Sequence, residues 1–153
     1  MATAQLKKIT AFRRGLRSAP LDERMRIERQ GVPADIVRGL LGQLDLTGAE
    51  FQSHMGIPKA TYTKKMREKS DLDGTTGQSV LGLLELVNKV EDMLALENDP
   101  AAKRFDAARW VGRWIREPQP ALGNKAPIEV MDTPSGRASV LRILGAAQSG
   151  AYQ

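Results

Sequence analysis

Apolar residues recur along this chain at intervals of three and four positions, the spacing that places side chains on one face of a helix. The clearest stripe predicts a long helix over 79–97, and another predicts a helix that begins near Pro33. Runs in which β-branched and polar residues alternate are missing, so the pattern gives no strand. We therefore expect an all-α fold of about eight helices.

Capping and breaking residues set the other expected boundaries. The segment 4–17 is either a short basic helix or a frayed arm, and a polar loop is expected over 68–78. Asp99 is the expected N-cap of a single helix over 100–115. Thr133 is the expected cap of the last helix, and Gly150 is expected to end it.

The stretch 46–67 has the features of a helix–turn–helix. Thr47 and Glu50 have the spacing of a capping box, and Gly56 can take the left-handed conformation of a tight turn. Five apolar residues are expected to hold the two helices together: Ala49, Phe51, Met55, Ile57 and Met66. Six polar residues of the second helix are expected to bind DNA: Lys59, Thr61, Tyr62, Lys64, Lys65 and Arg67. The alternative is a plain helical hairpin with a solvated lysine face.

The charge of the chain is uneven. Residues 1–70 hold 14 Lys and Arg against 7 Asp and Glu, whereas residues 71–153 hold 9 against 11. The net charge of +5 therefore comes from the first half. Such a balance indicates either a polyanionic partner or a solvated basic surface.

Several chemistries are excluded or disfavoured by composition. The chain has no cysteine, which excludes disulfides, and its single histidine, His54, lacks a nucleophile to activate. Asp71 and Asp73 are read as a solvated turn because no third ligand lies near them in sequence. We expect no catalytic residues, no metal and no cofactor.

The expected location is the cytoplasm. No apolar run approaches the roughly 20 residues that span a bilayer, so we expect no membrane association. The first residues also lack the apolar stretch of a secretory signal.

Trp110 and Trp114 are four residues apart and share a helix face. Core packing is the favoured interpretation of this pair. An interface at one edge of that face stays open as the alternative.

The C-terminal half carries a distinctive string of residues. It runs from Ala108-Arg109-Trp110 and Trp114-Ile115-Arg116-Glu117-Pro118 through 121–133 to Gly136, Val140, Leu144 and Gly150-Ala151-Tyr152. The string resembles the toxin-binding domain of the Xre/MbcA/ParS antitoxins. Upstream, Gly56-Ile57-Pro58-Lys59-Ala60-Thr61 is similar to the helix–turn–helix that precedes this domain in the family. The resemblance covers about residues 32–153, and Asn124 stands where a second glycine is frequent.

This resemblance implies a helical N-terminal domain with an Xre-like helix–turn–helix, followed by a helical toxin-binding domain. Residues 1–31 would be an N-terminal helical arm used for dimerisation. Residues 32–72 would form the DNA-binding domain, and residues 73–153 the toxin-binding domain.

The resemblance also implies an antitoxin of a type II toxin–antitoxin system. Its protein partner would be a RES-domain toxin that consumes NAD+ or ADP-ribosylates a target, and the antitoxin would block that toxin's active site. Operator DNA would be the second partner, bound by a homodimer that represses its own operon and forms a hetero-oligomer with toxin. The residues expected at the toxin are Arg137, Arg142, Gly150, Ala151, Tyr152 and Gln153. The alternatives are a frayed terminus for the tail and a stand-alone helix–turn–helix transcriptional regulator without a cognate toxin.

Overall fold

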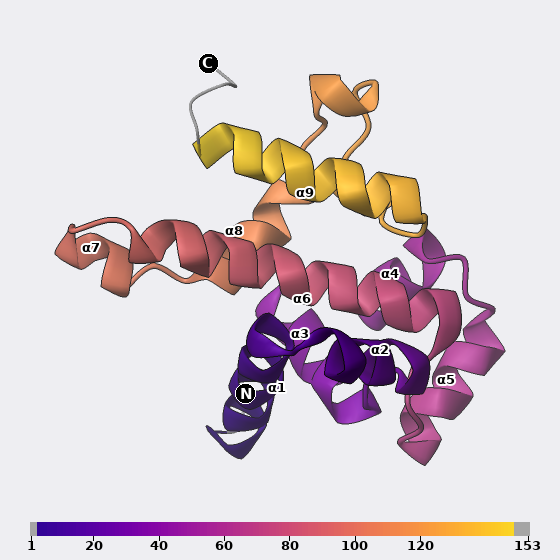
Figure 1. The fold of residues 1–153 in the computed structure, drawn as a ribbon. Coiled ribbons are helices and arrows are strands. Elements are labelled where there is room, and N and C mark those ends of the chain that lie inside the picture. Colours follow the sequence, from indigo (N-terminus) through magenta and orange to yellow (C-terminus); the bar gives the residue numbers. More distant parts are fainter. Residues whose placement is uncertain (1–2, 149–153) are drawn as a thin grey trace.

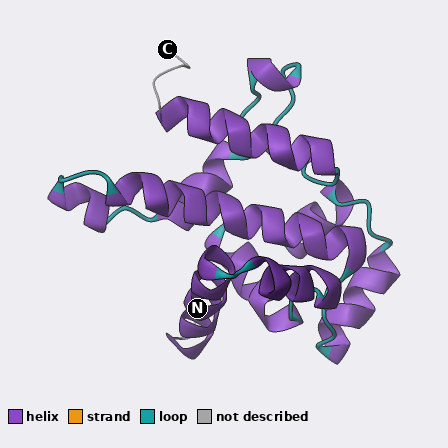
Figure 2. Cartoon of the chain, in the orientation of Figure 1, coloured by secondary structure: helices purple, strands orange, loops and turns teal. Residues whose placement is uncertain are grey.

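The computed structural model describes residues 3–148, which fold into nine α-helices and two short 3-10 helices (Figure 1). These residues form no strand, which confirms the all-α prediction (Figure 2). The α-helices are α1 (Thr3–Ser18), α2 (Leu21–Gln30), α3 (Ala34–Gln43), α4 (Gly48–His54), α5 (Lys59–Glu68), α6 (Gly74–Ala95), α7 (Pro100–Lys103), α8 (Ala107–Trp114) and α9 (Pro134–Gln148). The 3-10 helices are η1 (Pro120–Leu122) and η2 (Pro127–Glu129).

Helix α6 lies at the centre of the molecule. It contacts α1 and α2 on one side and α8 and α9 on the other (Figure 1). Its consecutive residues Leu83 and Leu84, and then Leu86 and Val87, are each at most 1% exposed, so neighbours cover the helix on several faces. The buried apolar residues of both halves of the chain form one continuous cluster around it.

Helix α1 packs on α3 through apolar contacts and on α6 through charged and polar ones, so residues 3–18 form a helix that packs on the same chain. Ile9 and Leu16 are buried, and a Cβ at Gly39 of α3 would lie 2.1 Å from Ile9 Cδ1. The buried Arg13 donates to Asn88 Oδ1 at 3.2 Å and pairs with the carboxylate of Glu91. Asn88 in turn donates to the Arg13 carbonyl oxygen at 3.2 Å.

A short backbone bridge joins the two ends of the α3–α5 segment. Val32 donates to the Leu72 carbonyl oxygen at 2.9 Å, and Leu72 donates back to the Val32 carbonyl oxygen at 2.8 Å. Gly31 precedes the bridge with a φ of +93°, and a Cβ there would lie 2.4 Å from the Leu72 carbonyl oxygen. The bridge holds the start of α3 beside the start of α6.

Two of the expected boundaries were wrong. The loop predicted over 68–78 is shorter, because α6 already begins at Gly74. The first turn of α6 packs closely on this loop, since a Cβ at Gly77 would lie 2.4 Å from the Leu72 carbonyl oxygen. The single helix predicted over 100–115 is two helices. Asp106 accepts a hydrogen bond from the Arg109 backbone N–H at 3.0 Å and so starts α8 as a new helix.

Two predicted caps are confirmed. Asp99 accepts from the Ala101 N–H at 2.9 Å at the start of α7. Thr133 Oγ1 accepts from the Gly136 N–H at 3.0 Å at the start of α9. The predicted stop of this last helix at Gly150 lies outside the described residues.

The Arg13–Glu91 pair gives the fold a testable dependence on pH. Burial raises the pKa of Glu91, but hydrogen bonds and charge from Arg13 and Arg17 outweigh it, so the pKa lies below its ordinary 4.5. The stabilisation is therefore present above pH 4.5 and is lost as the pH falls through the folded-state pKa. We expect Glu91→Gln to lower the free energy of unfolding at neutral pH by about 1–2 kcal/mol, because the pair is only partly buried.

Urea unfolding measured from neutral pH down to about pH 3 tests this expectation. The difference in stability between wild type and Glu91→Gln should shrink with acidification. The matched control is Glu97→Gln, since the Glu97 side chain is exposed and makes no ion pair within residues 3–148. A difference that stays constant over the whole range would contradict the assignment.

Candidate functional site

A tight turn sets the angle between α4 and α5. Gly56 has a φ of +67°, which confirms the left-handed conformation predicted for it. Gln52 holds the turn closed, because its side chain donates to the Ile57 carbonyl oxygen at 2.6 Å and its carbonyl accepts from the Ile57 N–H at 3.1 Å. Met55 and Ile57 are buried beneath it.

Aromatic packing joins the inner faces of α4 and α5. The rings of Phe51 and Tyr62 have centroids 5.8 Å apart, and Phe51 is fully buried. A Cβ at Gly48 would lie 3.2 Å from the Tyr62 ring, so the small residue lets the ring approach α4. Met66 is buried as predicted, whereas Ala49 is exposed and does not pin the helices.

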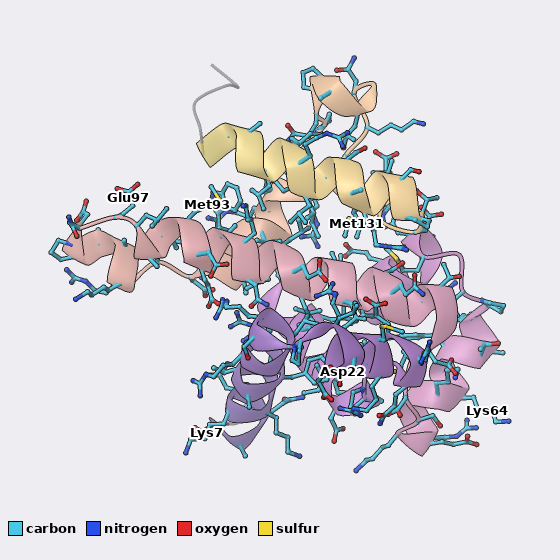
Figure 3. All side chains as sticks on the ribbon, in the orientation of Figure 1. Lys7, Asp22, Lys64, Met93, Glu97 and Met131 are labelled. Atoms are coloured by element: carbon cyan, nitrogen blue, oxygen red, sulfur yellow. The ribbon has the colours of Figure 1, made fainter. Side chains whose placement is uncertain are left out.

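The six residues predicted to bind DNA fall into two groups. Lys59, Thr61, Lys64 and Arg67 are exposed, and the Lys64 side chain extends away from the body of the molecule (Figure 3). Tyr62 is half-buried against Phe51, and burial raises its pKa, an effect that the charge of Arg38 opposes. Its ring therefore supports α5 from the inside.

Lys65 belongs to the second group as well. Its ammonium donates to the Asp71 carbonyl oxygen at 3.3 Å and lies 3.4 Å from Asp73 Oδ1. These contacts tie α5 to the connection that precedes α6. Because its donors are shared in this way, Lys65 has a positioning role within the chain.

Thr63 is exposed and is absent from the predicted set. It lies four residues from both Lys59 and Arg67, so the three side chains share one face of α5. That spacing was the signal in the sequence. The outer face of α5 thus combines two hydroxyls with three cations.

The α8 tryptophans stack on each other, with ring centroids 5.8 Å apart and an interplanar angle of 13°. Trp114 is buried, which confirms the core reading for that residue, and Trp110 is half-buried. One ring of the pair therefore reaches the surface beside α8.

The loop after α8 contains the residue that departs from the resemblance. Asn124 has a φ of +64° and follows Gly123 at +67°. Glycine favours this left-handed region and asparagine tolerates it better than most residues, so Asn124 preserves the loop. Its N–H donates to the Gln119 carbonyl oxygen at 3.0 Å.

Arg137 links α9 to α6. Its guanidinium donates to Ser79 Oγ at 3.2 Å, to the Met131 carbonyl oxygen at 3.1 Å and to Gln78 Oε1 at 3.3 Å. Burial lowers its pKa, and the charges of Asp132 and Glu85 oppose that shift. Arg142 is exposed, and among residues 3–148 its guanidinium donates only to Ser139 Oγ, at 3.1 Å within its own helix.

Comparison with known proteins places both halves of the chain. Residues 23–85 match the antitoxin Xre-like helix–turn–helix domain, and residues 101–150 match the antitoxin Xre/MbcA/ParS C-terminal toxin-binding domain. A protein of Sphingobium sp. (strain YBL2), named Prs ADP-ribosylating antitoxin, is 34% identical over 142 residues, which are 93% of this chain and 87% of that protein. This chain belongs to the Xre-type antitoxin family.

The two matches divide the antitoxin at α6. The helix–turn–helix match begins in α2 and ends inside α6, and the toxin-binding match begins in α7 and includes α8 and α9. Arg137 and Arg142 lie within the toxin-binding match. Gly150, Ala151, Tyr152 and Gln153 lie outside the described residues.

No helix among residues 3–148 of the antitoxin is long and apolar enough to cross a membrane. The same residues bring together no three acidic or histidine side chains that would hold a metal ion.

The two arginines of α9 should behave differently in the free antitoxin. We expect Arg137→Ala to lower the free energy of unfolding by about 1–2 kcal/mol, because it removes the hydrogen bonds to Ser79 and Met131. Arg142→Ala should leave stability within about 0.5 kcal/mol of wild type, since its side chain is exposed. Urea midpoints measure both, and equal midpoints for the two variants would refute the structural role of Arg137.

Proposed function

We propose that this antitoxin represses its own operon by placing α5 in the major groove of operator DNA. The observation that supports this most is the outer face of α5, where Lys59, Lys64 and Arg67 are exposed while the inner face is packed on Phe51. In helix–turn–helix proteins the second helix enters the major groove and the first crosses the backbone. Lysine and arginine donate to phosphates and to guanine edges there.

The protein partner in this proposal is a RES-domain toxin that consumes NAD+ or ADP-ribosylates a target protein. The name of the Sphingobium relative refers to ADP-ribosylation of Prs, and the toxin-binding match covers α7 to α9 here. Blocking the cleft of such a toxin requires occupancy and no chemistry, so the proposed role is non-catalytic. Arg142 is exposed on α9 and available to an acidic group of the toxin.

The proposed toxin-binding surface comprises Arg137 and Arg142 of α9 and the tail Gly150–Gln153. Tyr152 supplies an aromatic ring that can stack in a nucleotide cleft and a hydroxyl that can donate a hydrogen bond. We assign the blocking of the toxin's active site to these four residues.

The proposed assembly is a cytoplasmic homodimer that forms a hetero-oligomer with toxin. Dimers of helix–turn–helix proteins read two half-sites about one helical turn apart. We assign dimerisation to residues 1–31, in which Leu21 is 74% exposed at the start of α2. A dimer interface there would cover the Leu21 side chain.

Removing two cations from α5 tests DNA binding. We expect Lys64→Ala combined with Arg67→Ala to weaken binding to the DNA upstream of the antitoxin's own coding sequence. The slope of log affinity against log salt should fall by about 2, since each lost phosphate contact removes about 0.9. Electrophoretic mobility shifts over a salt series measure it. The matched control is Lys103→Ala with Arg104→Ala on α7, which removes the same charge elsewhere; a slope equal to wild type in the α5 variant would refute the surface.

Deleting Gly150–Gln153 tests the toxin half. The truncated antitoxin should protect cells less well than wild type against the toxin encoded beside it, because the residues that fill the cleft are gone. Its DNA binding should be unchanged, which shows that the chain still folds. Equal protection by the truncated and full chains would contradict the proposed plug, and absence of any toxic neighbour would favour a stand-alone regulator.

A further inference from the structure

A polar groove of about 700 Å³ opens between α8, the connection from α3 to α4, and the start of α1. Arg109, Arg113 and Arg116 line it: the first two share one face of α8, and Arg116 follows two residues after the end of the helix. All three are exposed. Leu6 and Leu44 are the only residues with large apolar side chains in its lining.

One end of this arginine row touches the helix–turn–helix. Arg116 donates to the Asp45 carbonyl oxygen at 2.7 Å and pairs with Glu50 at 2.9 Å. Glu50 is in the first turn of α4, where its N–H is capped by Thr47 Oγ1 at 3.0 Å. The pairing lowers the pKa of Glu50, chiefly through the hydrogen bond from Arg116.

The guanidinium groups of the other two arginines have no partner among the described residues. Within residues 3–148 the guanidinium groups of Arg109 and Arg113 make neither a hydrogen bond nor an ion pair. Two carboxylates, Asp45 and Asp106, also line the groove. The Asp106 carboxylate faces the amino end of α8, where it accepts from the Arg109 backbone N–H.

Helix α8 is held rigidly against the helix–turn–helix. A Cβ at Gly112 would lie 2.1 Å from the Leu44 carbonyl oxygen, so the backbones of α8 and of the end of α3 are in direct contact. The Arg116 contacts add a second attachment one turn later. The positions of Arg109 and Arg113 relative to α4 are therefore fixed before any partner binds.

We infer that Arg109 and Arg113 bind phosphates of the DNA that flanks the site read by α5. This rests on the proposed DNA binding, in which α4 crosses the phosphate backbone. From Arg116, beside α4, the row extends back over seven residues, about 10 Å along the helix, or roughly three base steps of one strand. The planar guanidinium group can donate two parallel hydrogen bonds to one phosphate.

The chemistry of the groove favours a phosphate backbone over a protein segment. Protein interfaces concentrate their energy in buried aromatic and apolar anchors, and this lining offers no aromatic residue. A helix of the toxin-binding match thus supplies part of the DNA surface. A toxin seated on α8 would compete with flanking phosphates for the same arginines.

The test compares Arg109→Ala combined with Arg113→Ala against the control Lys103→Ala with Arg104→Ala, in the full chain. The DNA is a duplex from upstream of the antitoxin's coding sequence, used at full length and trimmed to the bases that α5 protects from cleavage. With the full duplex, the salt slope of the groove variant should fall by about 2, and affinity should drop about tenfold or more at low salt. With the trimmed duplex, wild type and groove variant should bind alike.

Three outcomes would overturn the inference. If the salt slope of the groove variant equals that of wild type and control on the full duplex, Arg109 and Arg113 are not part of the DNA surface. A flattened salt slope in the α5 variant would in that case still support the proposed function. Loss of toxin protection with unchanged DNA binding would assign the groove to a protein. Failure of the wild type to bind either duplex would refute both proposals. Arg109→Lys with Arg113→Lys, which keeps the charge, should recover most of the slope if the fold is intact.

Discussion

Burial of α6 on several faces determines where the other helices pack. A helix with apolar residues on several faces is unstable in water, so other helices must cover each of these faces. Helices α1 and α2 cover one side, and α8 and α9 cover the other. The polar contacts of Arg13 with Asn88 and of Arg137 with Ser79 then fix how the covering helices lie. Both proposed binding surfaces are built on this one core.

That arrangement gives the antitoxin a physical link between its two proposed activities. Lys65 attaches α5 to the connection that precedes α6, and the bridge between Val32 and Leu72 holds the start of α3 beside the start of α6. Helix α9 is attached to α6 through the bond from Arg137 to Ser79. Helix α8 is attached to the end of α3 through Gly112, and to α4 through Arg116. Packed helices therefore join the toxin-binding match to the helix–turn–helix.

The sequence predicted those features that depend on neighbours three or four residues away. The caps at Asp99 and Thr133 and the turn at Gly56 are of this kind, because the partner groups lie within the same helix end. The hydrogen bonds of Lys65 and Arg137 depend on residues brought together by tertiary packing. The sequence therefore does not distinguish a lysine that is free on the surface from one that is hydrogen-bonded within the chain. The exposed residues of α5 could be predicted because the apolar residues of the helix mark its buried face. The prediction that Tyr62 lies on the outer face was wrong, because its ring packs on Phe51.

In this structure α6 joins both proposed surfaces into one cooperatively unfolding body. Native-state hydrogen exchange can detect this cooperativity, since it reports the free energy of opening at each amide. Buried amides of α3, α6 and α9, such as those of Leu40, Leu84 and Leu144, should exchange with the same opening free energy, equal to that of global unfolding. Exchange of the α9 amides at a distinctly lower free energy than those of α3 would show that the toxin-binding half opens by itself and would contradict the account.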